Sequence, residues 1–355
     1  MKSGATIHLA PAHPCMGWVS MNRYWQALVQ EAEADADVRS LFPCGAVETP
    51  GQGRWMKQWK RRVAYPWMVK SRVKSGVLHV LDHSFADLIA SVRPSVRTVV
   101  TVHDLIPLTD PADLTPAQQA RFQKTVNWIA RADQVVCVSE HTRAEVLRLL
   151  KVAAEKVQVL PNGTSQLATP DAAMKDRLAA LPPFILSVGG TRPRKNLRLL
   201  VPLTKNLEER GLRVNLVRAG AKLDANLAAQ IREHAELLEL GSVTDAELSA
   251  AYSQAALTLV PSLQEGFGLP VLEAMQAGCP VVYSNATSLP EVAGEAGLAF
   301  DPLDADQAAD QCASVLTDMA LRNMLITLGH QRASLFTWKR HWEGLRKIYE
   351  GLLNS

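Results

Sequence analysis

Short apolar runs alternate with longer amphipathic runs along most of this chain, from about Arg97 onward. The apolar runs are nearly continuous and rich in valine, which is typical of parallel strands covered on both faces. After about Phe300 the pattern indicates no further strand. The runs predict strands over Val99–Val102, Gln134–Val138, Val157–Leu160, Phe184–Val188, Val214–Val217, Leu257–Val260 and Pro280–Tyr283.

The stretches between these runs carry helix signals. Ser139 stands at the N-cap position of a helix predicted over Glu140–Leu150. Thr244 and Glu247 have the spacing of a capping box. Pro202 lies inside a third helical pattern, where it either kinks the helix or shifts its start. Strands that alternate with helices in this way predict right-handed βαβ units and doubly wound parallel sheets, an α/β fold.

The alternation pauses between Asn162 and Pro183, in a segment with turn signals and a short helical patch. We interpret this segment as a linker between two α/β domains, residues 1–165 and 166–335, followed by a terminal helical segment, residues 336–355. Ligands of doubly wound sheets bind beyond the carboxyl ends of the strands. Two facing domains would therefore form a cleft lined by strand–helix junctions.

The most informative junction reads LVPSLQEGFGLPVLEAMQAGCPVVY, from Leu259 to Tyr283. A buried strand ends in a glycine-containing loop, and a helix starts near Pro270, a favoured first position for proline. Backbone N–H groups at the glycines and the helix N-terminus suit a diphosphate. Glu265 in the loop and Glu273 one turn into the helix can face the same ligand. The alternative is a loop charge and a solvated helix residue.

A second junction, Phe184–Leu200, places Gly189 and Gly190 after a strand and Arg194 and Lys195 at the predicted head of a helix. A guanidinium and an ammonium beside a helix N-terminus form a strong diphosphate site. The alternative is a solvated basic helix start, although cations there oppose the helix dipole.

A histidine follows a predicted strand of the first domain. His103 would face the predicted cleft, and the alternative is a structural histidine or a loop stabilised by Asp104. His83, His8 and His13 are further candidates with less support from their positions.

Together these stretches resemble the family-4 retaining glycosyltransferases, enzymes of the GT-B fold. The segment with Glu265 and Glu273 is similar to their paired-glutamate motif, and GGTRPRKN resembles their glycine-then-Arg-Lys-Asn motif. VHDLIPL, VSEHTRAEV, VLPNG and the late FTW also resemble family segments, so the likeness runs from about Leu78 to Trp338. It implies two facing Rossmann-like domains whose last helix crosses back to the first domain.

The resemblance also implies roles for individual residues. Arg194 and Lys195 would hold the donor diphosphate, and Glu273 would bind the nucleotide ribose. Glu265 would contact the donor sugar near its anomeric carbon. His103 would contact that sugar from the opposite domain.

Further donor contacts are implied by the same resemblance, with two departures. The nucleobase would lie near Val243. Many members carry a Gly-Gly pair in the first loop, where PAHPCMGWVSM offers only Gly17. Many also carry an arginine at the position of Gly190, and Arg192 is the candidate replacement. The backbone that would hold the sugar and phosphates is that of Gly266, Phe267, Gly268 and Leu269.

The family mechanism is transfer with retention, drawn as front-face attack in which the leaving phosphate takes the acceptor proton. Arg194, Lys195 and the helix N-terminus would stabilise the departing diphosphate without a metal ion. No cofactor is implied beyond the nucleotide-sugar co-substrate. We do not assign Glu265 as a covalent nucleophile of the kind found in retaining glycosidases.

Composition narrows the partners. With 21% charged residues and a net charge of +3, bulk electrostatics does not favour a nucleic-acid binder. The five cysteines are scattered without a C-x-x-C pair, which favours a reducing compartment over disulfides or structural zinc. No run approaches the roughly 18 apolar residues of a membrane span, and no signal peptide is visible. We therefore expect a cytoplasmic protein.

The segment Arg54–Lys74 carries eight basic residues, no acidic residue and three tryptophans. This composition suits an anionic membrane surface, and the acceptor would then be a lipid-linked saccharide at the inner face of a membrane. One alternative is RNA, for which no recognised motif is present. The other is a solvated helix with its tryptophans in the core. Pro66 is expected to prevent one long amphipathic helix.

Three functional hypotheses follow. The first is a retaining hexosyltransferase of surface-polysaccharide synthesis. We favour mannose from GDP-mannose, because G-x-x-x-P-R-K-N resembles mannosyltransferase relatives. The second is a non-catalytic nucleotide-sugar-binding protein of the same fold. The third is an epimerase or phosphorylase, for which no pyridoxal phosphate lysine motif stands out.

Overall fold

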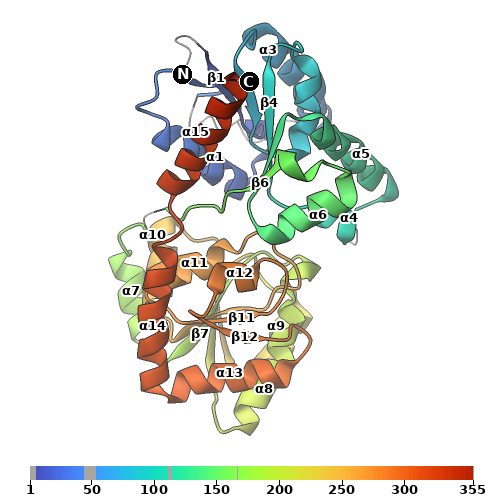
Figure 1. Ribbon diagram of the computed structural model, residues 1–355. Helices are drawn as coiled ribbons and strands as arrows, with labels where there is room; N and C mark the ends of the chain where they lie inside the picture. The colour runs from blue at the N-terminus through green and yellow to red at the C-terminus, as the bar shows by residue number, and fades with distance from the viewer. Residues whose placement is uncertain (1–4, 44–52, 111–113, 166, 355) are drawn as a thin grey trace. The chain divides into compact units, whose positions relative to one another are not determined.

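The computed structural model describes residues 5–43, 53–110, 114–165 and 167–354. The chain divides into two compact units (Figure 1). Unit 1 comprises Met1–Gly163 and Thr337–Ser355, and unit 2 comprises Thr164–Phe336. Each unit contains a six-stranded parallel sheet with helices on both faces.

The sheet of unit 1 has the strand order β2-β1-β3-β4-β5-β6. The chain adds β2 on one side of β1 and then returns to add β3 on the other, which makes the β1–β3 boundary a topological switch point. The strands are β1 (Ile7–Ala10), β2 (Val38–Ser40), β3 (Val77–Val80), β4 (Arg97–Val102), β5 (Gln134–Cys137) and β6 (Val157–Val159).

The α-helices of unit 1 are α1 (Val19–Glu31), α2 (Arg54–Trp59), α3 (Tyr65–Arg72), α4 (Ile106–Thr109), α5 (Pro116–Val126), α6 (Glu140–Leu150) and α15 (Trp338–Asn354). The π-helical segment η2 (Lys60–Ala64) joins α2 to α3. The 3₁₀ segments are η1 (Pro14–Met16), η3 (His83–Ser91), η5 (Asn127–Arg131) and η6 (Ala154–Lys156).

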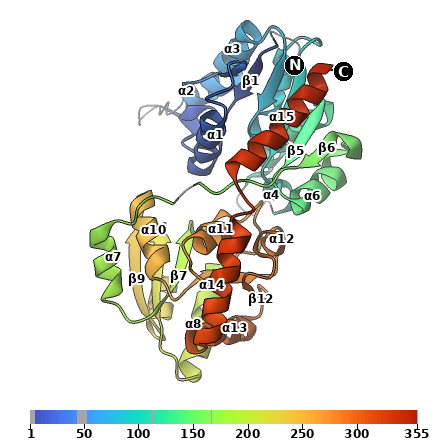
Figure 2. The same ribbon diagram turned by 60° about the vertical axis from the view of Figure 1, so that its left-hand side comes forward.

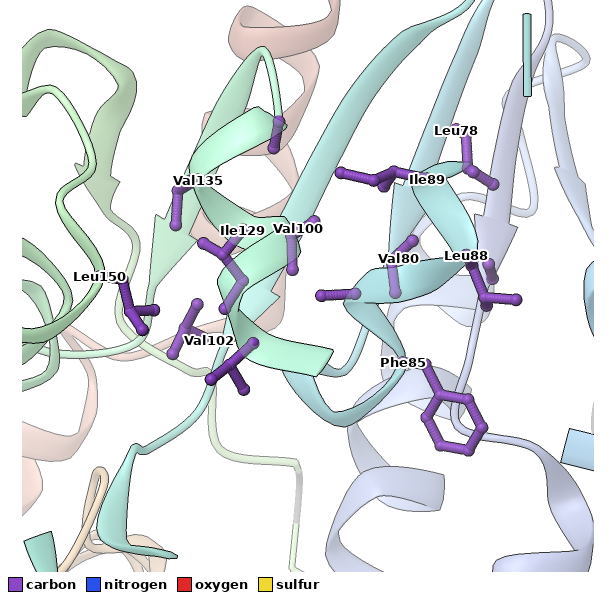
Figure 3. Packing of buried hydrophobic residues seen from close by; sticks show 14 of the residues in the cluster. Leu78, Val80, Phe85, Leu88, Ile89, Val100, Val102, Ile129, Val135 and Leu150 are labelled. Carbon is purple, nitrogen blue, oxygen red and sulfur yellow. The ribbon is translucent and has the colours of Figure 1, made fainter. Parts of the chain in front are cut away.

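Alternate side chains of the central strands enter two different hydrophobic cores. Leu78, Val80 and Val100 belong to the core formed with η3 and η5 (Figure 3). Val77 and Val99 enter the opposite core, which includes residues of α1 and α15. Burial on both faces is the reason why these strands show continuous apolar runs. The last helix, α15, covers the second of these cores and therefore packs on unit 1, as the sequence predicts.

Unit 2 has the strand order β12-β11-β10-β7-β8-β9. Its strands are β7 (Phe184–Gly189), β8 (Asn215–Gly220), β9 (Glu236–Gly241), β10 (Leu257–Val260), β11 (Val281–Ser284) and β12 (Leu298–Phe300). Its helices are α7 (Ala172–Ala179), α8 (Leu200–Glu209), α9 (Ala225–Arg232), α10 (Asp245–Gln254), α11 (Leu269–Gln276), α12 (Leu289–Ala293), α13 (Ala305–Thr317) and α14 (Met319–Ala333), with 3₁₀ turns η7 (Pro193–Lys195) and η8 (Leu197–Leu199).

All seven predicted strands are present, and the described residues contain five further strands that were not predicted. β1 and β3 each contain a histidine that interrupts the apolar run, and the buried ring of His79 is accommodated by hydrogen bonds. β2, β9 and β12 are edge strands; β2 and β9 contain polar residues that are not buried, and β12 has only three residues. Pro202 lies in the first turn of α8, so it shifts the helix start and does not kink the helix.

The expectation that Pro66 prevents one long helix is wrong. Residues 54–72 are helical throughout (Figure 2), and the π-helical turn η2 ends at Ala64, two residues before Pro66. The backbone N–H of Tyr65 donates to the carbonyl of Lys60, five residues back. This wider turn accommodates a ring that would otherwise clash with the preceding turn. The alternative of core tryptophans is also wrong, since Trp55 and Trp67 are 74% and 70% exposed.

A buried polar network links the C-terminal helix to the sheet of unit 1. The ring of His79 hydrogen-bonds Tyr349 (2.6 Å) and Thr101 (2.8 Å). The hydroxyl of Tyr24 lies 2.9 Å from Nε2 of His341. Burial lowers the pKa of His79 to about 3 and that of His341 to about 4. Both rings are therefore neutral in the folded protein at neutral pH.

We expect unit 1 to lose stability as the pH falls below about 6.5. The unfolded chain protonates both histidines near their ordinary pKa, whereas the folded unit does not, so protons bind preferentially to the unfolded state. By pH 5 each histidine should remove about 2 kcal/mol of unfolding free energy. All eight tryptophans lie in unit 1, so urea titrations followed by tryptophan fluorescence at pH 7.5 and 5.0 measure this loss.

The variant His341→Gln supplies the comparison. Glutamine can replace hydrogen bonds but does not titrate, so its unfolding free energy should depend less steeply on pH. An unfolding free energy that is equal at both pH values would contradict this account of the network.

The described cysteines, Cys15, Cys137, Cys279 and Cys312, are buried and form no disulfide with one another, and Cys44 lies outside the described residues. Within the part of the chain that the structure describes, no helix combines the length and apolar character needed to cross a membrane.

Candidate functional site

Arg194, Lys195 and the predicted donor residues from Glu265 to Leu269 lie in the loops at the topological switch point of unit 2. β7 and β10 are neighbouring parallel strands, and the chain adds β8 and β9 on one side and β11 and β12 on the other. The loops that follow β7 and β10 leave at the same edge of the sheet. Doubly wound sheets bind their ligands at this position.

The β7 loop begins at Gly189, whose φ of +123° favours glycine. Arg218 on the neighbouring strand β8 supports the start of this loop. The buried guanidinium of Arg218 donates to Oγ of Ser187 (3.0 Å) and to the carbonyl of Gly189 (3.0 Å). Gly220 is equally required, because a Cβ there would stand 2.3 Å from the Gly189 carbonyl oxygen. The start of the loop is thus held by close backbone approach and by a buried cation.

One sequence expectation about this loop is wrong. Arg194 and Lys195 do not stand at the head of a helix. They lie in the 3₁₀ turn η7, which ends at Asn196 in the left-handed conformation, and α8 begins only at Leu200. The side chain of Asn196 donates to the carbonyl of Pro302. The dipole of α8 therefore plays no part in placing the two cations.

An ion triad joins the two loops. Nζ of Lys195 lies 2.5 Å from Oε1 of Glu265, and a guanidinium nitrogen of Arg194 lies 3.1 Å from Oε2. Arg194 also donates to the carbonyl of Gln264. The backbone carbonyl of Arg194 accepts from the N–H of Leu263 (2.7 Å). Three of the predicted site residues are thus in direct contact.

The triad controls the ionisation of Glu265. Burial alone would raise the pKa of this carboxyl group, but the charges of Lys195 and Arg194, with hydrogen bonds from Lys195 and Ser262, outweigh burial and lower it. Glu265 is therefore a carboxylate at neutral pH. It cannot act as a proton donor there, and the triad as a whole carries one excess positive charge.

The loop after β11 fixes Glu265 from the other side. Oγ1 of Thr287 accepts from the backbone N–H of Glu265 (3.0 Å). The hydroxyl of Ser288 donates to the carbonyls of Glu265 and Phe267, at 2.9 Å each. Thr287 has a φ of +52°, an uncommon value for a β-branched residue. Sequence reasoning missed these residues, although they follow a predicted strand that ends at the same edge.

The glycine segment leads into α11. Gly268, with a φ of +114°, is the residue before the helix, and Leu269 is its first residue. Phe267 is buried, and its ring packs edge-on against Phe336 at 5.9 Å. Gly266 and Leu269 are half-buried. The segment can therefore present backbone N–H groups of the helix N-terminus while Phe267 anchors it.

The predicted ribose contact lies on helix α11, and the predicted nucleobase contact lies in the loop between β9 and α10. Glu273 is half-buried on α11, and its Oε2 accepts from the hydroxyl of buried Tyr252 on α10 (3.0 Å). Val243 is half-buried and directly precedes Thr244, the N-cap of α10. The Thr244–Glu247 capping box that the sequence predicts is present. The ligand roles of Glu273 and Val243 stay predictions.

In unit 1, Gly17 and His103 follow strands. Gly17 is left-handed (φ +65°), and a Cβ there would meet no described atom within 4 Å. His103 is buried, its Nε2 lies 2.8 Å from the carbonyl of Leu81, and desolvation lowers its pKa. A carbonyl only accepts, so Nε2 carries the proton and Nδ1 is an acceptor. The donor roles of both residues also stay predictions.

Two of the other histidine candidates, His13 and His83, have structural partners. Nδ1 of His13 accepts from the N–H of Cys15 (3.2 Å), and its ring packs on Phe42. Nδ1 of His83 accepts from the N–H of His103 (3.3 Å). These contacts account for the burial of both rings without a ligand.

A cavity of about 740 Å³ lies beside the β7 loop. Arg192, Asn196 and Asp224 are among its lining residues, and it shares Leu263 with the β10 loop. The triad and Glu273 do not line it. Among residues 5–43, 53–110, 114–165 and 167–354, no three His, Cys, Asp or Glu side chains are grouped so that they could hold a metal ion.

The fold and the motifs together define a class of protein. A family model described as Glycosyltransferase Family 4 matches residues 23–165, and one described as Glycosyl transferases group 1 matches residues 173–332. An O-antigen chain mannosyltransferase B of Escherichia coli is 32% identical over 68% of this chain and 67% of that protein. The chain belongs to glycosyltransferase family 4 and is a glycosyltransferase of GT-B fold.

A further relative is similar in sequence to this chain, and two solved structures share its fold. The serotype-specific mannosyltransferase WbdA of Escherichia coli is 30% identical over 68% of this chain. The matched region is about a third (32%) of the length of WbdA. A sucrose-phosphate synthase of Thermosynechococcus elongatus shares the fold, with a TM-score of 0.73, 21% identity and 99% of each chain covered. So does Anabaena HepE, solved with UDP and glucose, with a TM-score of 0.73, 17% identity and 97% and 99% of the chains covered.

Proposed function

We propose that this protein is a retaining mannosyltransferase that moves mannose from GDP-mannose to a glycan acceptor in surface-polysaccharide synthesis. The observation that carries the proposal is the Arg194–Glu265–Lys195 triad at the switch point of unit 2. The mannosyltransferase names of the relatives support the sugar. The acceptor is proposed to be lipid-linked, at the inner face of a membrane.

The triad offers charge where the reaction needs it. Arg194 and Lys195 can bind the two phosphates of the donor, which replace part of their contact with Glu265. As the glycosidic bond breaks, positive charge grows on the sugar and negative charge on the diphosphate. Arg194 and Lys195 stabilise the negative charge on the diphosphate, and the ionised Glu265 stabilises the positive charge on the sugar. The departing phosphate then takes the acceptor proton, because the contacts of Glu265 with Lys195 and Arg194 lower its pKa and make its carboxylate a weak base.

The remaining donor contacts follow the sequence predictions. Glu273 binds the ribose, the segment from Gly266 to Leu269 binds sugar and phosphates through its backbone, and Val243 lies near the base. Gly17 and His103 of unit 1 contact the donor as well. The positive charge of the triad makes a metal ion unnecessary, and the proposed reaction uses no cofactor beyond the nucleotide-sugar.

A thermal-unfolding screen tests the donor site. GDP or GDP-mannose at a hundredfold excess over its dissociation constant should add about 2.7 kcal/mol to the stability of unit 2. For a unit of this size we expect a midpoint roughly 5–10 °C higher, measured by circular dichroism in the presence of EDTA. UDP, ADP and dTDP are the controls. A response to none of these nucleotides would overturn the donor site.

Transfer assays with EDTA, using membrane extracts and mannose-terminated oligosaccharides as acceptors, test the reaction itself. NMR of the product should show the anomeric configuration of the donor retained. Inversion would contradict the retaining mechanism, and a strict requirement for a divalent cation would contradict metal independence. A nucleotide that shifts the midpoint without turnover on any acceptor would favour the alternative, a non-catalytic nucleotide-sugar-binding protein.

A further inference from the structure

The helical segment over residues 54–72 has two apolar faces. Tyr65, Val69 and Val73 repeat at a spacing of four and are buried against the core of unit 1. Trp59, Val63 and Trp67 repeat at the same spacing, displaced by two residues. Two residues correspond to about half a helical turn, so the second row lies on the side away from the core.

The second row is exposed along its length. Trp55 is 74%, Trp59 45%, Val63 52% and Trp67 70% exposed. We call these four residues the tryptophan ridge. A helix that simply covers a core turns polar residues to the solvent. An exposed row of large apolar side chains on one helix is instead typical of an interaction surface.

The ridge is flanked by positive charge. Residues 54–74 contain eight basic residues and no acidic one. Lys57, Arg62, Lys70 and Lys74 are exposed. Arg61 differs, because its guanidinium donates to the carbonyl of Ser84 (2.6 Å) and stacks 4.8 Å from the ring of Phe85.

We propose that the tryptophan ridge and its basic flank dock on the surface of an anionic lipid bilayer, with the helix lying in the interfacial plane. Tryptophan favours the boundary between headgroups and acyl chains, and basic residues are attracted to anionic headgroups. An exposed apolar row with basic neighbours matches a partner that has an apolar layer beneath a negatively charged surface.

The charge pattern argues against a second copy of this chain as the occupant. A symmetric dimer places the same patch on both subunits. The basic flanks would then face each other without an acidic residue from the same segment to offset them. A bilayer supplies both the negative charge and the apolar layer.

Docking would bring unit 1 to the leaflet that carries a lipid-linked acceptor. This link to the acceptor rests on the proposed function. Binding to lipid requires neither a donor nor turnover, however. Vesicle binding therefore tests the surface even where the proposed reaction fails, and a nucleotide response of unit 2 tests the donor site even where vesicles are not bound.

Co-sedimentation of the full chain with vesicles tests the proposal. One set contains only phosphatidylcholine, and the other contains phosphatidylglycerol as well. We expect binding to the anionic set that weakens as salt rises. The triple variant Lys57→Glu, Arg62→Glu, Lys70→Glu should lose at least about tenfold in partition coefficient. Arg61 is left unchanged, because its contacts to Ser84 and Phe85 support the fold.

Two further variants separate the apolar contribution from charge. Trp55→Ser, Trp59→Ser, Trp67→Ser should release the protein from anionic vesicles, whereas the same positions replaced by phenylalanine should retain most binding. The matched charge control is Lys175→Glu, Arg177→Glu, Lys205→Glu, three exposed positions of unit 2. It changes the net charge equally and should bind like the wild type.

Each remaining outcome either assigns the tryptophan ridge to another partner or overturns the proposal that it binds lipid. Wild-type protein that stays in the supernatant with both vesicle sets overturns the proposal, as does equal binding by the two Glu triple variants. Sedimentation velocity that shows a dimer lost in the Trp→Ser variant assigns the ridge to a second copy. Binding to single-stranded RNA without binding to vesicles assigns it to nucleic acid.

Discussion

Lys195→Gln should lower kcat/KM for sugar transfer by about 10²–10³-fold, the effect typical of removing one group that stabilises transition-state charge. Nζ of Lys195 lies 2.5 Å from Glu265, at the loop proposed to hold the diphosphate. Glutamine keeps a hydrogen-bond donor of similar length but removes the charge. The affinity for the nucleoside diphosphate should fall as well, measured by calorimetric titration beside the transfer assay.

Glu265→Gln separates the contribution of the carboxylate to transfer from that of the two cations of the triad. Removing the carboxylate charge releases Arg194 and Lys195 for phosphate, so the nucleoside diphosphate should bind at least as tightly as to the wild type. Transfer should nevertheless fall, since the negative charge beside the sugar is lost. Lys205→Gln on α8, with a side chain 56% exposed, is the control. Wild-type transfer by Lys195→Gln would contradict the proposed role of the triad.

Gly220→Ala should destabilise unit 2 by about 2–4 kcal/mol, because it combines backbone strain with overpacking. Gly220 has a φ of +123°, and its new Cβ would stand 2.3 Å from the carbonyl oxygen of Gly189. The two residues are paired on β7 and β8, so the strands must separate where the donor loop begins. We expect the unit 2 midpoint to fall by roughly 5–12 °C and transfer to fall with it.

Gly211→Ala is the matched control for this substitution. Gly211 also has a positive φ, +79°, but a Cβ there would meet no described atom within 4 Å. Only the conformational strain of about 1 kcal/mol remains. Circular dichroism reports both variants, whereas tryptophan fluorescence should not change, since every tryptophan lies in unit 1. Equal destabilisation by the two substitutions would show that the close approach of Gly220 to Gly189 is unimportant.

The sequence was sufficient for the parts of this protein that depend on local pattern. Strands buried on both faces read as continuous apolar runs, so β4, β5, β7, β8, β10 and β11 were predictable, and the edge strand β6 was marked by its two valines. Local capping made the starts of α6 and α10 predictable. The motifs around Glu265 and Arg194 marked the junctions at which a ligand binds. These features are encoded within a few residues, where propensity and burial agree.

Only the tertiary structure decided which groups meet. Arg194 and Glu265 are 71 positions apart, and their contact follows from the pairing of β7 beside β10. Thr287 and Ser288 reach the same loop because β11 lies next to β10. The exposure of Trp55 and Trp67 depended on which face of a continuous helix packs on the core, and a π-helical turn before Pro66 made that helix continuous. Such outcomes arise from packing between distant segments, which no local pattern encodes.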